Sequence, residues 1–123
     1  MVFFFLGSDF LKKYEIVKKN DEFNDIINTG KYLKNRFYNI YYKDGNTDFP
    51  KFGIAVSKKI GHAVERNKIK RQLRSLIDQH KNLFAKPNNY IIMVRKGVKE
   101  LSYSEMEEQF VHLLQKGFLN EKN

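Results

Sequence analysis

The longest periodic segment of the chain, residues 64–81, constrains the fold more than any other feature, because a short apolar run stands on each side of it. Residues 51–56 and 90–94 are mostly or continuously apolar, which is typical of strands buried inside a sheet. A helix between two buried strands packs its apolar stripe against the sheet that they form. The sequence therefore predicts an α/β fold with helices on a small mixed sheet.

A shorter helix and an aromatic strand are predicted upstream. Residues 21–29 carry apolar side chains on one helical face, begin with a capping residue and end before Gly30. The aromatic run 37–42 predicts a strand that ends in the turn residues 44–46, and there is room for an extra short strand between residues 31 and 48. No repeat or Pro/Gly-rich linker separates these elements from the rest, so we expect one domain.

The last helix is predicted to begin near Ser102, because Ser102 and Glu105 have the spacing of a capping box. The complete predicted order is α-β-β-(β)-α-β-α, an α+β two-layer sandwich. We expect the domain to cover residues 14–117, with residues 1–13 as an N-terminal extension that need not be ordered and residues 118–123 as a C-terminal tail.

The central helix combines an apolar stripe with a broad cationic face. On a helical wheel, Ile69, Leu73, Leu76 and Ile77 cluster on one side together with the ring of His80. The remaining positions carry Arg66, Asn67, Lys68, Lys70, Arg71 and Arg74.

The charge around this helix is strongly one-sided. Seven basic residues and a single acid, Glu65, lie between residues 58 and 74. Neighbouring like charges on a helix repel one another by roughly a few tenths of a kcal/mol, which phosphates placed among them would relieve. This pattern favours a nucleic-acid interface. The alternative is an ordinary solvated face, although such faces usually mix both signs of charge.

The whole chain is also basic, with 23 Lys and Arg residues against 14 Asp and Glu residues and a formal net charge of +9. This excess favours a polyanionic partner, nucleic acid before an anionic membrane surface, because neutralised phosphates release condensed counterions. The alternative is a generally basic protein without such a partner. Cysteine is absent, which excludes disulfides and thiolate metal sites and is compatible with a cytoplasmic location.

No catalytic motif stands out. His62, His80 and His112 have no metal-ligand spacing, and the acids at helix starts fit a role at the positive end of the helix dipole better than a metal site. There is no phosphate-binding loop and no nucleophile or zinc-protease motif. We therefore expect neither a catalytic group nor a metal site within this protein.

The segment 52–71, FGIAVSKKIGHAVERNKIKR, resembles the signature of the bacterial ribonuclease P protein family. The family pattern is a strand, then Ser-Lys-Lys-x-Gly-x-Ala-Val, then Arg-Asn-Arg-Ile-Lys-Arg at the start of a helix. Lys68 departs from this pattern by replacing the second arginine, which keeps the charge but loses the planar fork of a bidentate phosphate contact. Weaker matches extend the resemblance from about residue 14 to residue 114.

The resemblance implies a left-handed crossover between parallel strands, an exception to the usual hand. It also implies a subunit of ribonuclease P, the endoribonuclease that removes the 5′ leader of precursor tRNA. Catalysis and the Mg²⁺ ions would then belong mainly to the RNA subunit, with one protein bound to one RNA. The residues that bind the RNA subunit would be Arg66, Asn67, Lys68, Lys70, Arg71 and Arg74, with Lys58 as an additional basic residue.

The resemblance further implies a cleft between the first helix and the sheet that holds the single-stranded leader. Its contacts would be Phe23, Ile27, Tyr41 and Lys59. Aromatic faces stack on unpaired bases for about 1–3 kcal/mol each, whereas Ile27 stands where many members of the family have a second Phe and offers only an apolar surface. Without the resemblance, Phe23 and Ile27 are one helical turn apart and fit a core role better.

Two other hypotheses stay open at this point. A ribosomal or chaperone-like RNA-binding protein could use the same basic helix, but it would not improve tRNA processing. A protein-only nuclease would cleave without an RNA partner and would depend on acids such as Asp21 or Asp25. The specificity of the central motif favours the ribonuclease P hypothesis over both.

Overall fold

The computed structural model describes residues 2–4, 20–45, 48–84 and 86–121. They contain a five-stranded sheet of order β1-β4-β5-β3-β2. β4 and β5 are parallel, whereas the other three neighbouring pairs are antiparallel, so the predicted mixed sheet is confirmed. The strands are β1 (Val2–Phe4), β2 (Lys31–Lys34), β3 (Tyr38–Asp44), β4 (Lys51–Val56) and β5 (Asn88–Val94).

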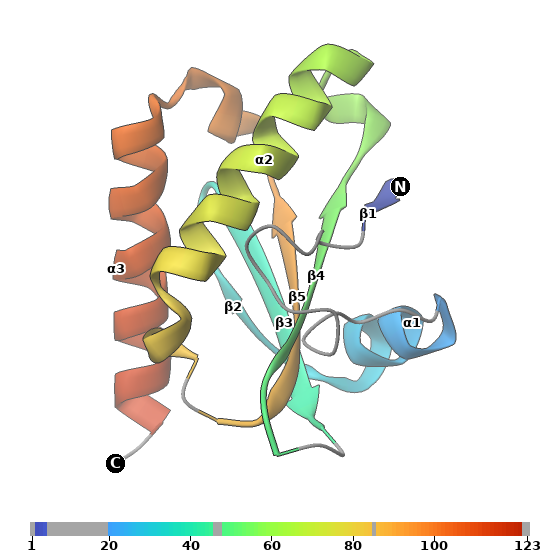
Figure 1. Cartoon of the computed structure of the whole chain (residues 1–123), viewed down its shortest axis with the longest axis vertical. Coiled ribbons are helices and arrows are strands. Elements are labelled where there is room, and N and C mark those ends of the chain that lie inside the picture. The colour runs from blue at the N-terminus through green and yellow to red at the C-terminus, as the bar shows by residue number, and fades with distance from the viewer. Residues whose placement is uncertain (1, 5–19, 46–47, 85, 122–123) are drawn as a thin grey trace.

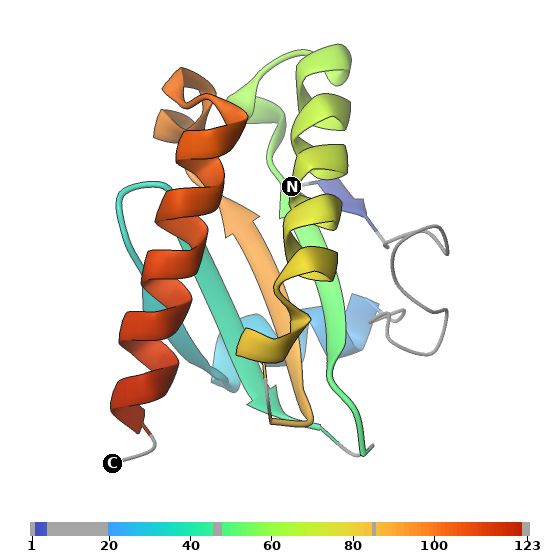
Figure 2. The ribbon, with the colours of Figure 1, turned by 60° about the vertical axis from the view of Figure 1, so that its left-hand side comes forward.

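Two long helices cover one face of the sheet, and a shorter helix lies on the opposite face (Figures 1 and 2). The long helices are α2 (Ala63–Gln79) and α3 (Tyr103–Glu121), and the shorter one is α1 (Asn20–Thr29). Short 3₁₀ turns connect them to the strands: η2 (Lys58–Ile60), η3 (Lys81–Leu83) and η4 (Lys96–Glu100). The two-layer sandwich is thus confirmed, with α1 added on its outer side.

The connection from β4 through α2 to β5 is left-handed. In Figure 1, α2 lies in front of the sheet, both strands point upward, and β5 lies to the left of its parallel neighbour β4. A right-handed connection would place β5 on the other side of β4. The unusual hand that the resemblance implied is therefore present in this chain.

The larger core lies between the sheet and the two long helices. Phe52 and Tyr90, on neighbouring strands, stack with ring centroids 5.6 Å apart, and Phe84 packs edge-on against both. The hydroxyl of Tyr38 donates a hydrogen bond of 2.9 Å to the carbonyl of Met106 in the first turns of α3. Burial raises the pKa of Tyr38 above its usual range, so the hydroxyl keeps its proton. These contacts fix α3 against β3.

The start of α3 has the predicted capping box. The Glu105 carboxylate accepts from the Ser102 backbone N–H at 2.9 Å, and the Ser102 hydroxyl accepts from the Glu105 N–H at 3.2 Å. At the other end, Phe118 packs edge-on against Tyr42 with ring centroids 5.3 Å apart. The helix continues to Glu121 and so extends past residue 117, where the sequence places the end of the domain.

A smaller core lies beneath α1. Phe23 and Ile26 of α1 pack with Ala55 of β4 and Ile91 of β5, and the Phe23 side chain is 0% exposed. A Cβ atom added at Gly53 would lie 2.7 Å from two ring carbons of Phe23. The glycine at position 53 therefore allows the Phe23 ring to rest directly on the sheet.

We expect Gly53→Ala to lower the free energy of unfolding by roughly 1–3 kcal/mol, because the added methyl group overlaps a buried ring that cannot move aside easily. Urea unfolding followed by circular dichroism measures this change. Gly97→Ala is the matched control, since its Cβ would lie 3.4 Å from the Phe37 ring, an ordinary contact. The control should stay within about 0.5 kcal/mol of the parent. Equal losses in both variants would contradict the proposed packing of Phe23 on Gly53.

The sequence predicts one of the two short strands, β2, but not the other, β1. β2 is the extra short strand for which the sequence left room, and this expectation is confirmed. β1 was not predicted, because three residues are too few to show a strand pattern; it pairs with β4 and places Phe3 opposite Ala55. β1 falls within the predicted N-terminal extension, and residues 5–19, which include the boundary expected at residue 14, lie outside the described residues.

Candidate nucleic-acid interface

The turn between β4 and α2 is held by local hydrogen bonds. The Ser57 hydroxyl accepts from the Lys59 N–H at 3.1 Å, and the Glu65 carboxylate accepts from the N–H of His62, the N-cap of α2, also at 3.1 Å. A Cβ atom at Gly61 would lie 2.7 Å from the same carboxylate, so the glycine leaves room for this cap. The first turn of α2 is therefore fixed relative to the sheet.

The only acid in this basic region is already engaged. The second oxygen of Glu65 lies 3.0 Å from the Lys99 ammonium in η4. The hydrogen bond from Lys99, and then the one from the His62 backbone, hold the pKa of Glu65 below its usual range, so the group stays ionised near neutral pH. The negative charge of Glu65 is balanced within the protein, which leaves the neighbouring cations of α2 available to a partner.

Three of the six predicted RNA-subunit contacts form one exposed face of α2. Asn67, Lys68 and Arg71 are all exposed. They point away from the apolar stripe, whose members Ile69, Leu73, Leu76 and Ile77 are buried as the helical wheel predicts. Asn67, Lys68 and Arg71 are called the exposed face of α2 below.

The other three predicted contacts lie along the flank of the helix. Arg66 and Arg74 are half-buried, and Lys70 between them is only 6% exposed. Nη1 of Arg66 donates a hydrogen bond of 2.7 Å to the Gly61 carbonyl, so its guanidinium is folded back onto the turn. Burial lowers the pKa of Lys70, and the positive charges of Arg66 and Arg74 lower it further.

The burial of Lys70 corrects its predicted placement on an open cationic face. On the wheel Lys70 is about 20° from Ile77, so it stands at the edge of the stripe, where burial depends on the segment that packs against the helix. Its ammonium is therefore less accessible to a phosphate than the exposed face of α2.

A second surface forms on the side of the sheet that carries α1. Tyr32 of β2 and Tyr41 of β3 are directly opposite in the strand register, and their rings are 6.1 Å apart. Tyr32 is 63% exposed, whereas Tyr41 and nearby Ile27 are half-buried. Tyr32 and Tyr41 thus form an aromatic pair at the margin of α1. Sequence reasoning missed Tyr32, because only the pairing of β2 with β3 shows that it shares a face with Tyr41.

The structure does not bring all four predicted leader contacts together. Tyr41 and Ile27 pack against the small core beneath α1 and are partly open to solvent. Phe23 belongs to the same core but is fully buried, so its ring offers no face to a base in this conformation. Lys59 is exposed in η2, beyond the end of β4, and Lys58 beside it is exposed as well.

His80 has a structural role. Nε2 of His80 lies 2.9 Å from a Glu107 carboxylate oxygen and joins the end of α2 to α3, in keeping with the predicted position of its ring on the apolar side of the helix. Across the part of the chain that the structure describes, no three His, Asp or Glu side chains gather in a way that could hold a metal ion. None of the described helices is long and apolar enough to cross a membrane.

Comparison with known proteins gives one consistent result. A sequence model of the family Ribonuclease P matches residues 11–117. The "Ribonuclease P protein component" of Mycoplasma mycoides is 43% identical over 105 residues, which cover 85% of this chain and 96% of the relative. The protein of the same name from Bacillus cereus is 38% identical over 108 residues, with 86% of this chain and 93% of the relative covered.

Solved structures are similar as well. The RNase P protein of Staphylococcus aureus superposes with a TM-score of 0.76 at 32% identity and covers 82% of this chain and 93% of its own. The RNase P protein of Thermotoga maritima gives a TM-score of 0.76 at 26% identity, with 83% of this chain and 96% of its own covered. The similarity thus spans sequence and fold across most of the chain.

Proposed function

This chain belongs to the ribonuclease P protein family, and from that premise we propose that it binds the RNA subunit of ribonuclease P together with the 5′ leader of precursor tRNA. Members of this family are the protein component of the ribonucleoprotein that matures the 5′ ends of tRNA, so an RNA partner follows from membership. The specific partners, the contact residues, a stoichiometry of one protein to one RNA and a cytoplasmic location are parts of the proposal.

The exposed face of α2 is the observation that carries the proposal. Asn67, Lys68 and Arg71 stand free of the core, and the one nearby acid, Glu65, is neutralised by Lys99. An amide and two cations on a rigid helix suit contacts to phosphate oxygens, which position a protein on folded RNA without reading its sequence. Arg66 and Arg74 would support this face from the flank.

The aromatic pair Tyr32 and Tyr41 supports the leader-binding part of the proposal. An exposed aromatic ring stacks on an unpaired base with little sequence preference, which suits leaders of varied sequence. Ile27 adds an apolar surface beside Tyr41, and Lys59 could hold the backbone of the leader farther along the sheet. Of the residues proposed from the sequence, Phe23 would have a structural role only, because its buried ring packs α1 on the sheet.

The chemistry of cleavage is assigned to the RNA subunit in this proposal. Mg²⁺ held mainly by that RNA would activate water for attack on the phosphodiester and leave a 5′-phosphate on the mature tRNA. The protein would contribute positive charge between two polyanions, which repel each other otherwise. It would also hold the leader, the one part that distinguishes the precursor from the product.

Reconstitution with a bacterial ribonuclease P RNA tests this function. We expect no cleavage of precursor tRNA by the protein alone, and faster cleavage at low Mg²⁺ concentration when the protein is added to the RNA. Binding to the RNA without faster cleavage would favour a general RNA-binding protein, and cleavage by the protein alone would favour a nuclease. Mature tRNA serves as the control ligand, because it lacks the leader.

A further inference from the structure

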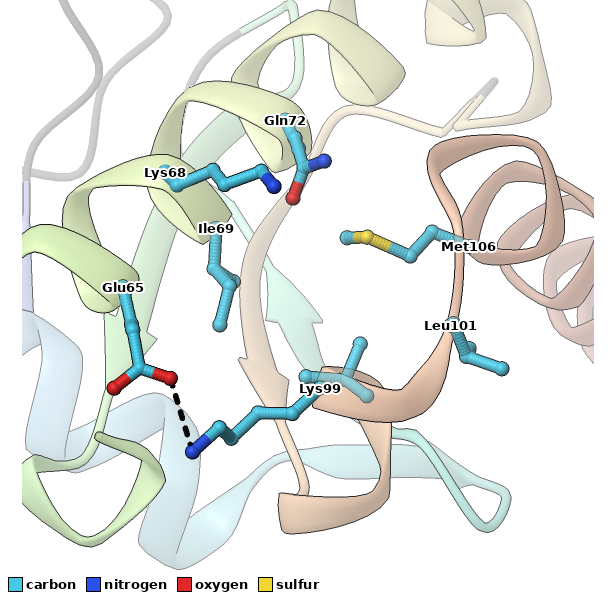
Figure 3. A pocket seen from close by; sticks show the side chains of 8 residues that line it. Glu65, Lys68, Ile69, Gln72, Lys99, Leu101 and Met106 are labelled. Carbon is cyan, nitrogen blue, oxygen red and sulfur yellow. Dashed lines mark ion pairs between the residues drawn. The ribbon is translucent and has the colours of Figure 1, made fainter.

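A small pocket opens between the first half of α2 and the segment that joins β5 to α3 (Figure 3). Its volume is about 140 Å³. The apolar part is formed by Ile69, Val98 and Met106, which are buried, and by Leu101, which is half-buried. In Figure 3, Ile69 from α2 and Met106 from α3 lie on opposite sides of the open centre, and the Met106 side chain extends toward it. The pocket therefore has an apolar floor fixed by the core.

The rim of the pocket is polar and carries net positive charge. Lys68 and Gln72, one turn apart on α2, line one side, and the ion pair of Lys99 with Glu65 lines the other (Figure 3). The rim carries two ammonium groups and one carboxylate, and that carboxylate is already engaged by Lys99 and by the His62 N–H. An anionic group entering at the Lys68 side would meet a cation without meeting a free carboxylate.

The size and chemistry of the pocket suit one planar heterocycle. Pockets for drug-sized ligands usually measure about 300–1,000 Å³, so this one holds only a single small group. A thioether makes favourable contacts with an aromatic ring, and the Gln72 amide can both donate to and accept from the edge of such a ring. An apolar side chain of a protein partner would use the floor but would leave the Gln72 amide and the rim cations without partners.

Lys68 belongs both to this pocket and to the exposed face of α2, so the pocket opens directly beside the proposed RNA contact. Folded RNAs present unstacked bases in loops and bulges, and proteins bind them by stacking and by hydrogen bonds to their edges. We propose that the pocket holds one unstacked nucleotide of the RNA subunit, with its base over Ile69 and Met106, its edge at Gln72 and its phosphate at Lys68. This inference rests on the proposed function.

Filling the pocket tests the inference. Gln72→Trp adds a ring where the base would lie and leaves every charge in place. We expect affinity for the RNA subunit to fall roughly tenfold, because the pocket can no longer take up the base. The dependence of affinity on salt should stay unchanged, because no phosphate contact is removed. Gln79→Trp, the same substitution at an exposed position of α2 outside the pocket, should bind like the parent.

The outcomes separate this inference from the proposed function. Failure of the parent protein to bind the RNA subunit would overturn the proposed function itself, whereas equal binding by the parent and Gln72→Trp would overturn only the pocket. If thermal unfolding shows that Gln72→Trp is not folded, Gln72→Ala replaces it, with an expected loss of roughly threefold to fivefold for one hydrogen bond; unchanged binding by that variant would likewise overturn the inference.

Mononucleotides provide a direct test on the folded chain. Adenosine 5′-monophosphate should shift the NMR signals of the Met106 methyl group and the Gln72 side-chain amide, whereas ribose 5-phosphate should shift neither. Equal shifts with both compounds would assign the site to phosphate alone and would contradict a base-binding pocket.

Discussion

Removing two cations from the exposed face of α2, with Lys68→Ala and Arg71→Ala together, is expected to weaken binding to the RNA subunit roughly tenfold to a hundredfold at physiological salt. Each cation that neutralises a phosphate releases condensed counterions when the complex forms. The slope of log affinity against log salt concentration should therefore become shallower by about two when both contacts are lost. Fluorescence anisotropy with labelled RNA subunit over a series of salt concentrations measures both quantities.

The matched control removes two positive charges from exposed positions outside α2. Lys86 and Lys96 are exposed and lie outside α2. Lys86→Ala combined with Lys96→Ala should lower affinity only slightly, through the smaller net charge, and should leave the salt slope close to that of the parent. If both double variants flatten the slope equally, the overall charge of the chain drives binding, and the face of α2 is an ordinary solvated surface.

Arg66 is a poorer choice for this experiment, although it is a basic residue of the same motif as Arg71. Its guanidinium donates to the Gly61 carbonyl, so Arg66→Ala would disturb the turn that orients α2 as well as any contact with RNA. Arg71 has an exposed side chain, and its loss is easier to interpret. The helical wheel agrees with this difference, because Arg66 is about 20° from Leu73 and about 140° from Arg71.

Periodicity was enough to predict the buried side of α2. Ile69, Leu73, Leu76 and Ile77 repeat at helical spacing, and any sheet packed on that stripe buries them. The placement of Lys70 could not be predicted in this way. It stands at the margin of the stripe, where burial depends on which neighbouring segment packs against the flank, and a single helix contains no information on that segment.

The second surface was harder to predict, because it depends on contacts between distant parts of the chain. Tyr32 lies in a four-residue strand whose residues are mostly exposed, and its pairing with Tyr41 is a matter of strand register. Phe23 and Gly53 are thirty positions apart, and only their contact shows that the ring is seated on the sheet. Helical spacing alone places Phe23 on the apolar face of α1. It does not show whether that face packs against a sheet or binds RNA.

Phe23→Ala is expected to lower the free energy of unfolding by about 3–5 kcal/mol, the usual cost of removing a fully buried aromatic ring. The ring fills the space between α1 and the sheet, with Gly53 directly beneath it. Urea unfolding measures the loss. At a temperature where the variant is still folded, we expect the preference of the holoenzyme for precursor over mature tRNA to stay near that of the parent, because the ring has no exposed face.

Tyr41→Ala is the informative partner of this variant, because Tyr41 is half-buried and belongs to the aromatic pair with Tyr32. Its loss should cost less stability than the loss of Phe23 but should reduce the preference for precursor tRNA roughly fivefold or more, since one base would lose its stacking surface. The reverse pattern would have a definite meaning. If folded Phe23→Ala lost the preference and Tyr41→Ala kept it, α1 would have to move off the sheet when the leader binds, and the buried ring of Phe23 would become the surface on which the base stacks.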